Sequence, residues 1–318
     1  MRQLFQYHET VGYHFVPGLT ARVLHESGGY LIRVNSLGFR STREFKATKS
    51  VGTKRVLVFG DSFTSGDGVP NEKRYTDVLE DLIPGLEIYN FAVSGTGTDQ
   101  QYLTYREFAG GFDHDLLVLS ILVDNIRRLK SSYRPYIDEG AAITVYPKPY
   151  FELVENQLAL RNVPVRRLSM AQSMLSPEES QAFRRLKGHG RRQNTSDRLP
   201  EYDDPLNPLW LLMRAILWRW IREHPKPVLV MPIPLYQFVE EICDPGHYAE
   251  RFRELCVATG ALFHDPLQDL RQYTPADRRG FRFSNDIHFT RAGHLALAMS
   301  LRPVLATILG KLERLPRT

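Results

Sequence analysis

The 318-residue sequence contains few cysteines, no long apolar run and no cofactor-binding fingerprint. Its two cysteines, Cys243 and Cys256, exclude a disulfide scaffold and any zinc site with four thiolates. No stretch approaches the roughly 20 apolar residues that a membrane span requires, so we expect no span. The P-loop and the dinucleotide glycine fingerprint are missing, and no cofactor or metal is expected.

The start of the chain also lacks the basic and apolar segments of a secretory leader, so we expect a cytoplasmic protein. Hydrophobic residues make up 42% and charged residues 24% of the chain, which is typical of a globular protein. A chain of this length buries about three quarters of its unfolded surface, enough for one large domain or two smaller ones.

The net charge of +5 comes from one segment. Residues 161–200 carry a local charge of +6, and the remainder of the chain carries −1. The most basic part, 184–198, has two glycines and no aromatic residue on which a base could stack. We therefore predict a solvated surface loop and no nucleic-acid partner. A site for an anionic polymer or substrate is the alternative.

Apolar runs alternate with amphipathic segments from residue 54 onward. Strands are predicted at 54–60, 86–93, 115–123, 226–233 and 260–266, and helices at 71–83, 209–224, 247–260 and 290–310. This alternation predicts a parallel sheet covered by helices on both faces, with ligands bound beyond the carboxyl ends of its strands. Thr290 is the expected N-cap of the last helix, which Pro303 should kink or divide.

Two regions fall outside this alternation. Residues 1–50 are predicted to form an extended arm or small hairpin packed on a domain of residues 51–318. Residues 131–206 are predicted to be an insertion after the third strand. Within it, Glu155 and Asn156 separate two segments of period two, which predicts a hairpin.

The first candidate catalytic residue is Ser62, in the segment GDSFTSGDG (60–68) after the first predicted strand. Gly60 permits a tight bend there, and the following amides can point at an anion. A serine at such a turn is commonly an N-cap, which is the alternative interpretation.

Asp286 and His288 lie two residues apart in FSNDIHFTRAGH (283–294), directly before the last predicted helix. An imidazole that removes a proton from a hydroxyl needs a carboxylate to fix its tautomer, and this pair supplies both groups. An exposed polar turn before a capped helix is the alternative.

Glycines and an asparagine follow the second and third predicted strands. Gly95 and Gly97 would let the backbone approach an acyl group, and Asn125 would aim a side-chain N–H at the same place. The amides of Ser62 and Gly95 and the Asn125 side chain would then form an oxyanion hole. A plain loop is the alternative for residues 90–100.

These four blocks, in this order over roughly residues 54–310, resemble the SGNH/GDSL hydrolase superfamily. The resemblance implies a flavodoxin-like three-layer α/β/α sandwich with strand order 2-1-3-4-5. It further implies that Ser62 is the nucleophile, His288 the base, Asp286 its orienting acid, and Ser62, Gly95 and Asn125 the oxyanion hole. The arm and the insertion are similar to a bacterial branch whose members are often encoded beside saccharide-modifying enzymes.

The sequence departs from the family pattern at two places. The third block usually has glycine, any residue, asparagine and aspartate, whereas here Asp124 precedes Asn125. The acid commonly lies three residues before the histidine, a position that Asn285 occupies here. Asp286, at two residues, is the predicted acid, and Asn285 is the alternative occupant.

Other polar and aromatic residues are weaker candidates for functional roles. Asp61, Arg127 and Arg128 are candidate substrate contacts, and an arginine facing the site would favour an anionic substrate. Three consecutive residues, Asp113 to Asp115, point in alternating directions before a strand, so a metal site there is not expected. Three tryptophans have helical spacing, which predicts core packing, with a sugar-stacking surface as the alternative: Trp210, Trp218 and Trp220.

The leading hypothesis is a metal-free serine esterase acting on a small acyl ester, with O-acetyl on a saccharide or metabolite suggested by the resemblance alone. An acyltransferase that uses the same acyl-enzyme is the second hypothesis. The third is a non-catalytic protein that binds a saccharide or polyanion through the insertion.

Overall fold

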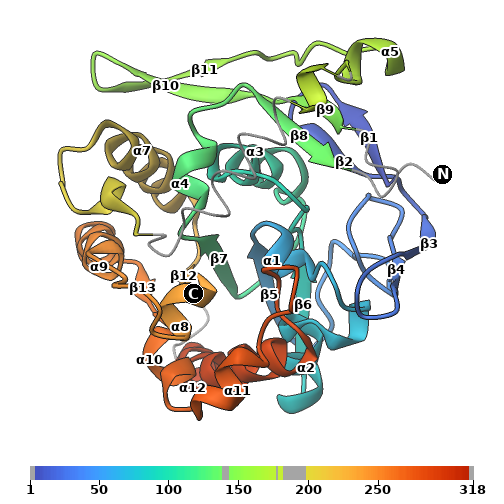
Figure 1. The fold of residues 1–318 in the computed structure, drawn as a ribbon. Helices are drawn as coiled ribbons and strands as arrows, with labels where there is room; N and C mark the ends of the chain where they lie inside the picture. The colour runs from blue at the N-terminus through green and yellow to red at the C-terminus, as the bar shows by residue number, and fades with distance from the viewer. Residues whose placement is uncertain (1–3, 138–142, 177, 182–197, 315–318) are drawn as a thin grey trace.

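The computed structural model describes residues 4–137, 143–176, 178–181 and 198–314. At its centre is a five-stranded parallel sheet in the order β13-β12-β7-β5-β6 (Figure 1). When these strands are numbered 1 to 5 along the chain and the sheet is read from β6, the order is 2-1-3-4-5, so the predicted topology is confirmed. Its strands are β5 (Lys54–Phe59), β6 (Leu86–Asn90), β7 (Leu116–Leu122), β12 (Val228–Ile233) and β13 (Leu262–Phe263).

Helices cover both faces of this sheet, as the alternation of apolar and amphipathic segments predicted (Figure 1). On one face α3 (Thr98–Phe108) packs against α7 (Pro208–Glu223), and on the other α2 (Tyr75–Leu82) packs against α12 (Arg291–Arg314). Further α-helices in the described part of the chain include α1 (Ser62–Ser65), α4 (Asn125–Arg128), α5 (Met170–Ser173), α8 (Tyr236–Val239), α9 (Tyr248–Thr259), α10 (Leu267–Arg271) and α11 (Pro275–Arg279).

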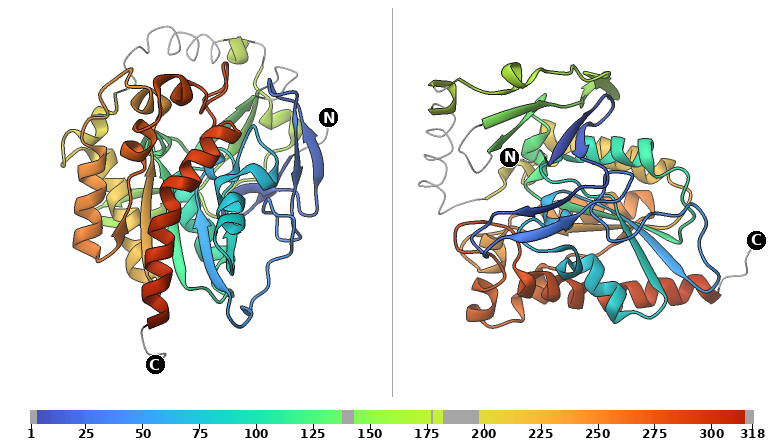
Figure 2. Two further views of the ribbon diagram at one scale, coloured as in Figure 1. Left: turned by 90° about the horizontal axis from the view of Figure 1, so that it is seen from below. Right: turned by 90° about the vertical axis from the view of Figure 1, so that its right-hand side faces the viewer.

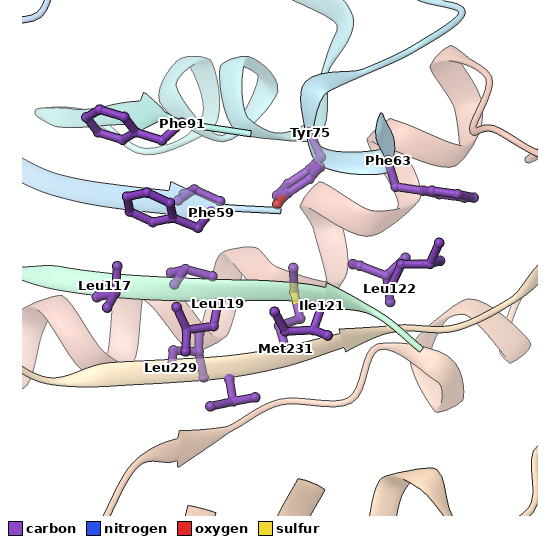
Figure 3. Close-up of a cluster of buried hydrophobic side chains, with 14 of the residues drawn as sticks. Phe59, Phe63, Tyr75, Phe91, Leu117, Leu119, Ile121, Leu122, Leu229 and Met231 are labelled. Carbon is purple, nitrogen blue, oxygen red and sulfur yellow. The ribbon is translucent and has the colours of Figure 1, made fainter. Parts of the chain in front are cut away.

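The core lies between these layers. β7 is buried along its whole length and carries apolar side chains on both faces, as expected for a central parallel strand. Figure 3 shows Leu117, Leu119 and Ile121 of this strand between the aromatic side chains around β5 and the apolar side chains of β12. This packing fixes the strand ends after which the predicted site residues follow.

α12 is continuous, with Pro303 inside it, so of the two expected effects of this proline, a kink or a division, the division does not occur. Thr290 caps the helix as predicted, because its Oγ1 accepts a hydrogen bond from the N–H of Gly293 at 3.3 Å. By length and apolar composition alone, α12 would suit a membrane span, contrary to our expectation that no stretch would. Its apolar face, which includes Leu297, Leu301 and Leu305, lies in the core.

The arm forms two antiparallel hairpins on the β6 side of the sheet, shown in blue in Figures 1 and 2. They are β1 (Phe5–His8) with β2 (Gly12–Phe15), and β3 (Thr20–Val23) with β4 (Tyr30–Arg33). Phe5, Tyr13 and Phe15 are buried in the main core, so the arm and the sheet share one hydrophobic core.

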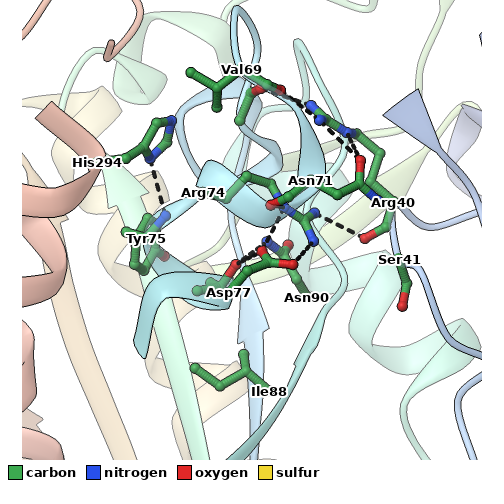
Figure 4. A network of polar contacts seen from close by, with 12 residues as sticks. Arg40, Ser41, Val69, Asn71, Arg74, Tyr75, Asp77, Ile88, Asn90 and His294 are labelled. Atoms are coloured by element: carbon green, nitrogen blue, oxygen red, sulfur yellow. Dashed lines mark hydrogen bonds and ion pairs between the residues drawn. The ribbon is translucent and has the colours of Figure 1, made fainter. Parts of the chain in front are cut away.

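The buried Arg40 links the arm to the loop that follows α1 (Figure 4). Its guanidinium donates to the carbonyls of Gly66 at 2.7 Å and Val69 at 2.8 Å and to Oδ1 of Asn71. Burial lowers the pKa of Arg40 to about 10. These hydrogen bonds therefore hold residues 66–71 against the arm.

The insertion contains two hairpins, β8 (Tyr133–Ile137) with β9 (Ile143–Pro147) and β10 (Tyr150–Val154) with β11 (Gln157–Arg161). Glu155 and Asn156 form the tight turn between the last two strands, both with positive φ, so this predicted hairpin is confirmed. Strand β8 was not anticipated. Most of the basic segment 184–198 lies outside the described residues, so its predicted character as a surface loop stays a prediction.

Candidate active site

Ser62 lies at the sharp turn between β5 and α1. A side chain at Gly60 would place its Cβ 2.5 Å from Oγ1 of Thr64 and 2.8 Å from the carbonyl oxygen of Ser120, so only glycine fits this turn. Asp61 is the N-cap of α1, because its carboxylate accepts a hydrogen bond from the N–H of Phe63 at 3.0 Å. Ser62 is therefore the first residue of the helix and not its cap, which leaves its hydroxyl free for another partner.

That partner is His288. Its Nε2 lies 2.8 Å from Oγ of Ser62, and its Nδ1 lies 2.7 Å from Oδ1 of Asp286. The structure thus joins residues 226 positions apart in one hydrogen-bonded chain, with the segment before α12 beside α1 (Figure 1). This is the arrangement in which an imidazole removes a proton from a serine hydroxyl while a carboxylate fixes its tautomer.

The arm holds the acidic end of this chain. Nε2 of His25 lies 3.1 Å from Oδ2 of Asp286, the oxygen that His288 does not use. The neighbouring Glu26 accepts hydrogen bonds from the backbone N–H of Asn285 at 2.9 Å and from its side-chain amide at 3.1 Å. Asn285 therefore faces the arm, and Asp286 is the residue that contacts His288. His25 and Glu26 belong to no motif, so no pattern in the sequence indicated a role for them.

The surrounding charges favour the protonated imidazole. Burial disfavours the imidazolium of His288, but the hydrogen bond that it donates to Asp286 and the negative charges of Asp67 and Asp286 outweigh the effect of burial and raise the pKa of His288 above 6.5. Burial raises the pKa of Asp286, but the hydrogen bonds that its carboxylate accepts from His288 and His25 outweigh burial and hold this pKa well below its usual range. A carboxylate that stays ionised suits the support of a transient imidazolium.

Unused hydrogen-bond donors lie near Ser62. No described residue accepts a hydrogen bond from the backbone N–H of Ser62 or Gly95. Asn125, three residues past the end of neighbouring β7, is fully buried, and neither polar atom of its side chain has a partner in the described part of the chain. A buried amide without a partner costs stability, so such a group usually has a function.

The loop that carries Gly95 is fixed from two sides. The hydroxyl of Tyr13, in the arm, donates to the carbonyl of Ser94 at 3.1 Å. The hydroxyl of Ser94 donates to Oδ1 of Asp67 at 2.5 Å, and burial raises the pKa of Asp67. Gly95 has a φ of +79°, which an L side chain rarely adopts, so the glycine is required for this backbone.

The three candidate substrate contacts are engaged within the protein. Asp61 is fully buried and accepts a hydrogen bond from Arg128 at 2.8 Å in addition to that from Phe63, so it does not reach a substrate. Arg128 also donates to the carbonyl of Thr96. Arg127 forms ion pairs with Glu201 at 3.0 Å and with Asp124 at 3.5 Å.

The tryptophans, His114 and Cys256 lie outside the candidate site. Trp210 and Trp220 are buried in the core as predicted, and Trp218 is 42% exposed. His114 contacts His224 and the carbonyl of Phe112, and the described residues contain no cluster of three or more potential metal ligands. Burial raises the pKa of the Cys256 thiol to about 12.

A cavity of about 350 Å³ lies between α10 and α12. None of the predicted site residues lines it. Its walls are formed by Asp269, Gln272, Tyr273, Ala296, Met299, Ser300 and Pro303.

The model of the GDSL-like lipase/acylhydrolase family matches residues 58–296, a span that holds Ser62, Gly95, Asn125, Asp286 and His288. The chain therefore belongs to this family of ester hydrolases. It is a carboxylic ester hydrolase of the SGNH type. None of the curated proteins matches the sequence.

The solved structures to which the chain is similar include three proteins of 9–15% identity. A lipolytic protein of the G-D-S-L family from Veillonella parvula is 12% identical, with 80% of this chain and 99% of that chain covered and a TM-score of 0.46. The esterase EstA from Pseudoalteromonas is 9% identical (81% and 99% covered, TM-score 0.46). An acetyl xylan esterase from Geobacillus stearothermophilus is 15% identical (83% and 97% covered, TM-score 0.44).

Proposed function

We propose that the protein hydrolyses a small acyl ester through a covalent acyl-enzyme formed on Ser62. The observation that carries the proposal is the continuous chain of short contacts from Ser62 through His288 to Asp286, at 2.8 and 2.7 Å. Such a chain lets a neutral imidazole take the serine proton as Oγ attacks the ester carbonyl.

In the first half-reaction, Oγ of Ser62 bonds to the carbonyl carbon and its proton passes to Nε2 of His288. The resulting oxyanion accepts hydrogen bonds from the N–H groups of Ser62 and Gly95 and from the amide of Asn125. When the carbon–oxygen bond to the alcohol breaks, the alcohol leaves with the proton from His288.

In the second half-reaction, His288 takes a proton from water, whose oxygen bonds to the acyl carbon. The bond to Ser62 then breaks, Oγ regains its proton and the carboxylic acid leaves. An O-acetyl group on a saccharide is the favoured substrate, and this choice rests on the sequence resemblance alone. If an alcohol replaced the water in this step, the same acyl-enzyme would make the protein a transferase.

A serine-reactive fluorophosphonate probe and a series of p-nitrophenyl esters test the proposal, applied to the wild type, Ser62→Ala and His288→Ala. We expect labelling and turnover in the wild type and the loss of both in the two variants. Ser41→Ala is the control, because the Ser41 hydroxyl hydrogen-bonds to the backbone of Arg43. A folded wild type inert to probe and esters would instead support a binding protein. Turnover that depends on an added alcohol would support the transferase.

A further inference from the structure

One arginine beside the proposed oxyanion hole, Arg134, has no role in the mechanism described above. Arg134 lies on β8, in the insertion, and its side chain covers Gly95. A Cβ on Gly95 would lie 3.2 Å from Nε and 3.7 Å from Cγ of Arg134. The insertion thus brings a guanidinium directly against the loop that would bind the oxyanion.

Arg134 differs from its two neighbouring arginines in having no partner. Arg128 is paired with Asp61 at 2.8 Å, and Arg127 with Glu201 at 3.0 Å. Among the described residues, nothing accepts a hydrogen bond from the side chain of Arg134 or forms an ion pair with it, although its backbone pairs with Tyr146 in the β8–β9 hairpin. All five N–H donors of its guanidinium are therefore open to a ligand.

The surroundings do not neutralise this charge locally. Burial, followed by the positive charge of Arg128, lowers the pKa of Arg134, while Tyr13, Asp61 and Asp124 offset part of the effect. The two carboxylates are already engaged, Asp61 by Arg128 and Asp124 by Arg127. A half-buried cation without a partner is costly, so a protein normally retains one where an anion binds.

We propose that Arg134 binds a carboxylate of the substrate, next to the ester that Ser62 attacks. This inference rests on the proposed function and narrows its substrate class to anionic esters. One unpaired guanidinium matches a monoanion, and its planar fork fits both oxygens of a carboxylate. The carboxylate lies on either the acyl half or the alcohol half of the ester, and the experiment separates the two.

Two pairs of substrates test the proposal. p-Nitrophenyl hemisuccinate against p-nitrophenyl butyrate compares a charged with a neutral acyl group of equal length. Mono-O-acetyl glucuronic acid against mono-O-acetyl glucose makes the same comparison on the alcohol side. The variants are Arg134→Gln and Arg134→Lys, and Arg161→Gln is the control, because Arg161 lies exposed on the same insertion and pairs with Glu152.

We expect the wild type to favour the anionic member of one pair, and Arg134→Gln to lower kcat/KM for that member by about tenfold to a hundredfold. Neutral esters should be hydrolysed within about twofold of the wild type. Arg134→Lys, which keeps the charge but loses the fork, should fall between these values. Because the charge has no partner, the melting temperature of Arg134→Gln should not fall.

Three results would overturn the inference: a wild type that hydrolyses neutral esters without preferring either anionic one, an equal loss for charged and neutral esters in Arg134→Gln, or a large drop in its melting temperature. The last would show a structural role. A wild type inert to all four esters and to the fluorophosphonate probe would overturn the proposed function itself, and the inference with it.

Discussion

The two halves of the proposed active site are held by different parts of the molecule. The serine half grows directly from the sheet: Ser62 is 5% exposed, and Oγ1 of Thr64, two residues on, lies 2.9 Å from Oγ of Ser120 in β7. The histidine half is a surface loop in which Ile287 is 45% exposed, and hydrogen bonds with the arm hold its Asp286 and Asn285. The nucleophile therefore depends on the core, and the orientation of the base depends on the turn of one hairpin, between β3 and β4, far away in the sequence.

The largest effect should come from breaking the contact inside the histidine half. Asp286→Asn keeps the size of the side chain but removes the charge that supports the imidazolium and permits the wrong tautomer of His288. We expect kcat to fall by about 10⁴-fold, the loss typical of this change in serine enzymes. Steady-state kinetics with a p-nitrophenyl ester measure it, and the exposed Asp81→Asn in α2 is the control. A loss below about a hundredfold would place the orienting role on another residue.

The next largest effect should come from the serine half. Asn125→Ala removes one of the three proposed oxyanion donors, so kcat should fall by about 10²–10³-fold while KM changes little. The amide has no partner in the described structure, so its loss should leave the melting temperature nearly unchanged. Kinetics and thermal unfolding on the same preparation decide whether Asn125 acts as an oxyanion donor or stabilises the fold. A large drop in melting temperature with unaltered kcat would make Asn125 structural.

A smaller effect should come from the arm. His25→Ala removes one hydrogen bond to the ionised Asp286, which we expect to lower kcat by about tenfold with little change in KM. In His25→Gln the side-chain amide reaches about as far as Nε2 and should restore most of the activity. His8→Ala, in β1 of the same arm, is the control. If His25→Gln were as slow as His25→Ala, the hydrogen bond would not be the reason for the loss.

The serine half was largely predictable from the sequence, because its signals are local. The apolar run at 54–60 predicted β5, Gly60 predicted the bend, and the strand order followed from the family resemblance. Asp286 and His288 were also found from a short motif before a predicted helix, and the structure places His288 against Ser62 and Asp286 against His288.

The contacts that the arm and the insertion make with the site escaped prediction for a physical reason. His25 contacts Asp286 across 261 residues, and Tyr13 contacts Ser94 across 81. Strands of four or five residues carry too little periodicity to fix where their hairpins pack, so no pattern indicated which side chains would face the site. The same holds for Arg134, whose place over Gly95 depends on how β8 packs.

The smallest effect should come from a change at Asp67, which touches both halves of the site. Its negative charge is one of the influences that raise the pKa of His288. Asp67→Asn removes that charge, and its amide oxygen can still accept the hydrogen bond from Ser94. The imidazolium then loses a stabilising charge while Asp286 and Asp61 remain, so the pKa of His288 should fall. Neutral, reactive His288 then persists to lower pH, and the acid limb of the kcat/KM profile should move to lower pH.

Above that limb, kcat/KM of Asp67→Asn should match the wild type, since the oxyanion loop keeps its anchor. Asp67→Ala loses the anchor as well and should be slower at every pH. The full pH profiles of the three proteins separate these effects. An acid limb that stays in place or moves to higher pH in Asp67→Asn would show that Asp67 acts on the serine half alone, through Ser94, and not on His288.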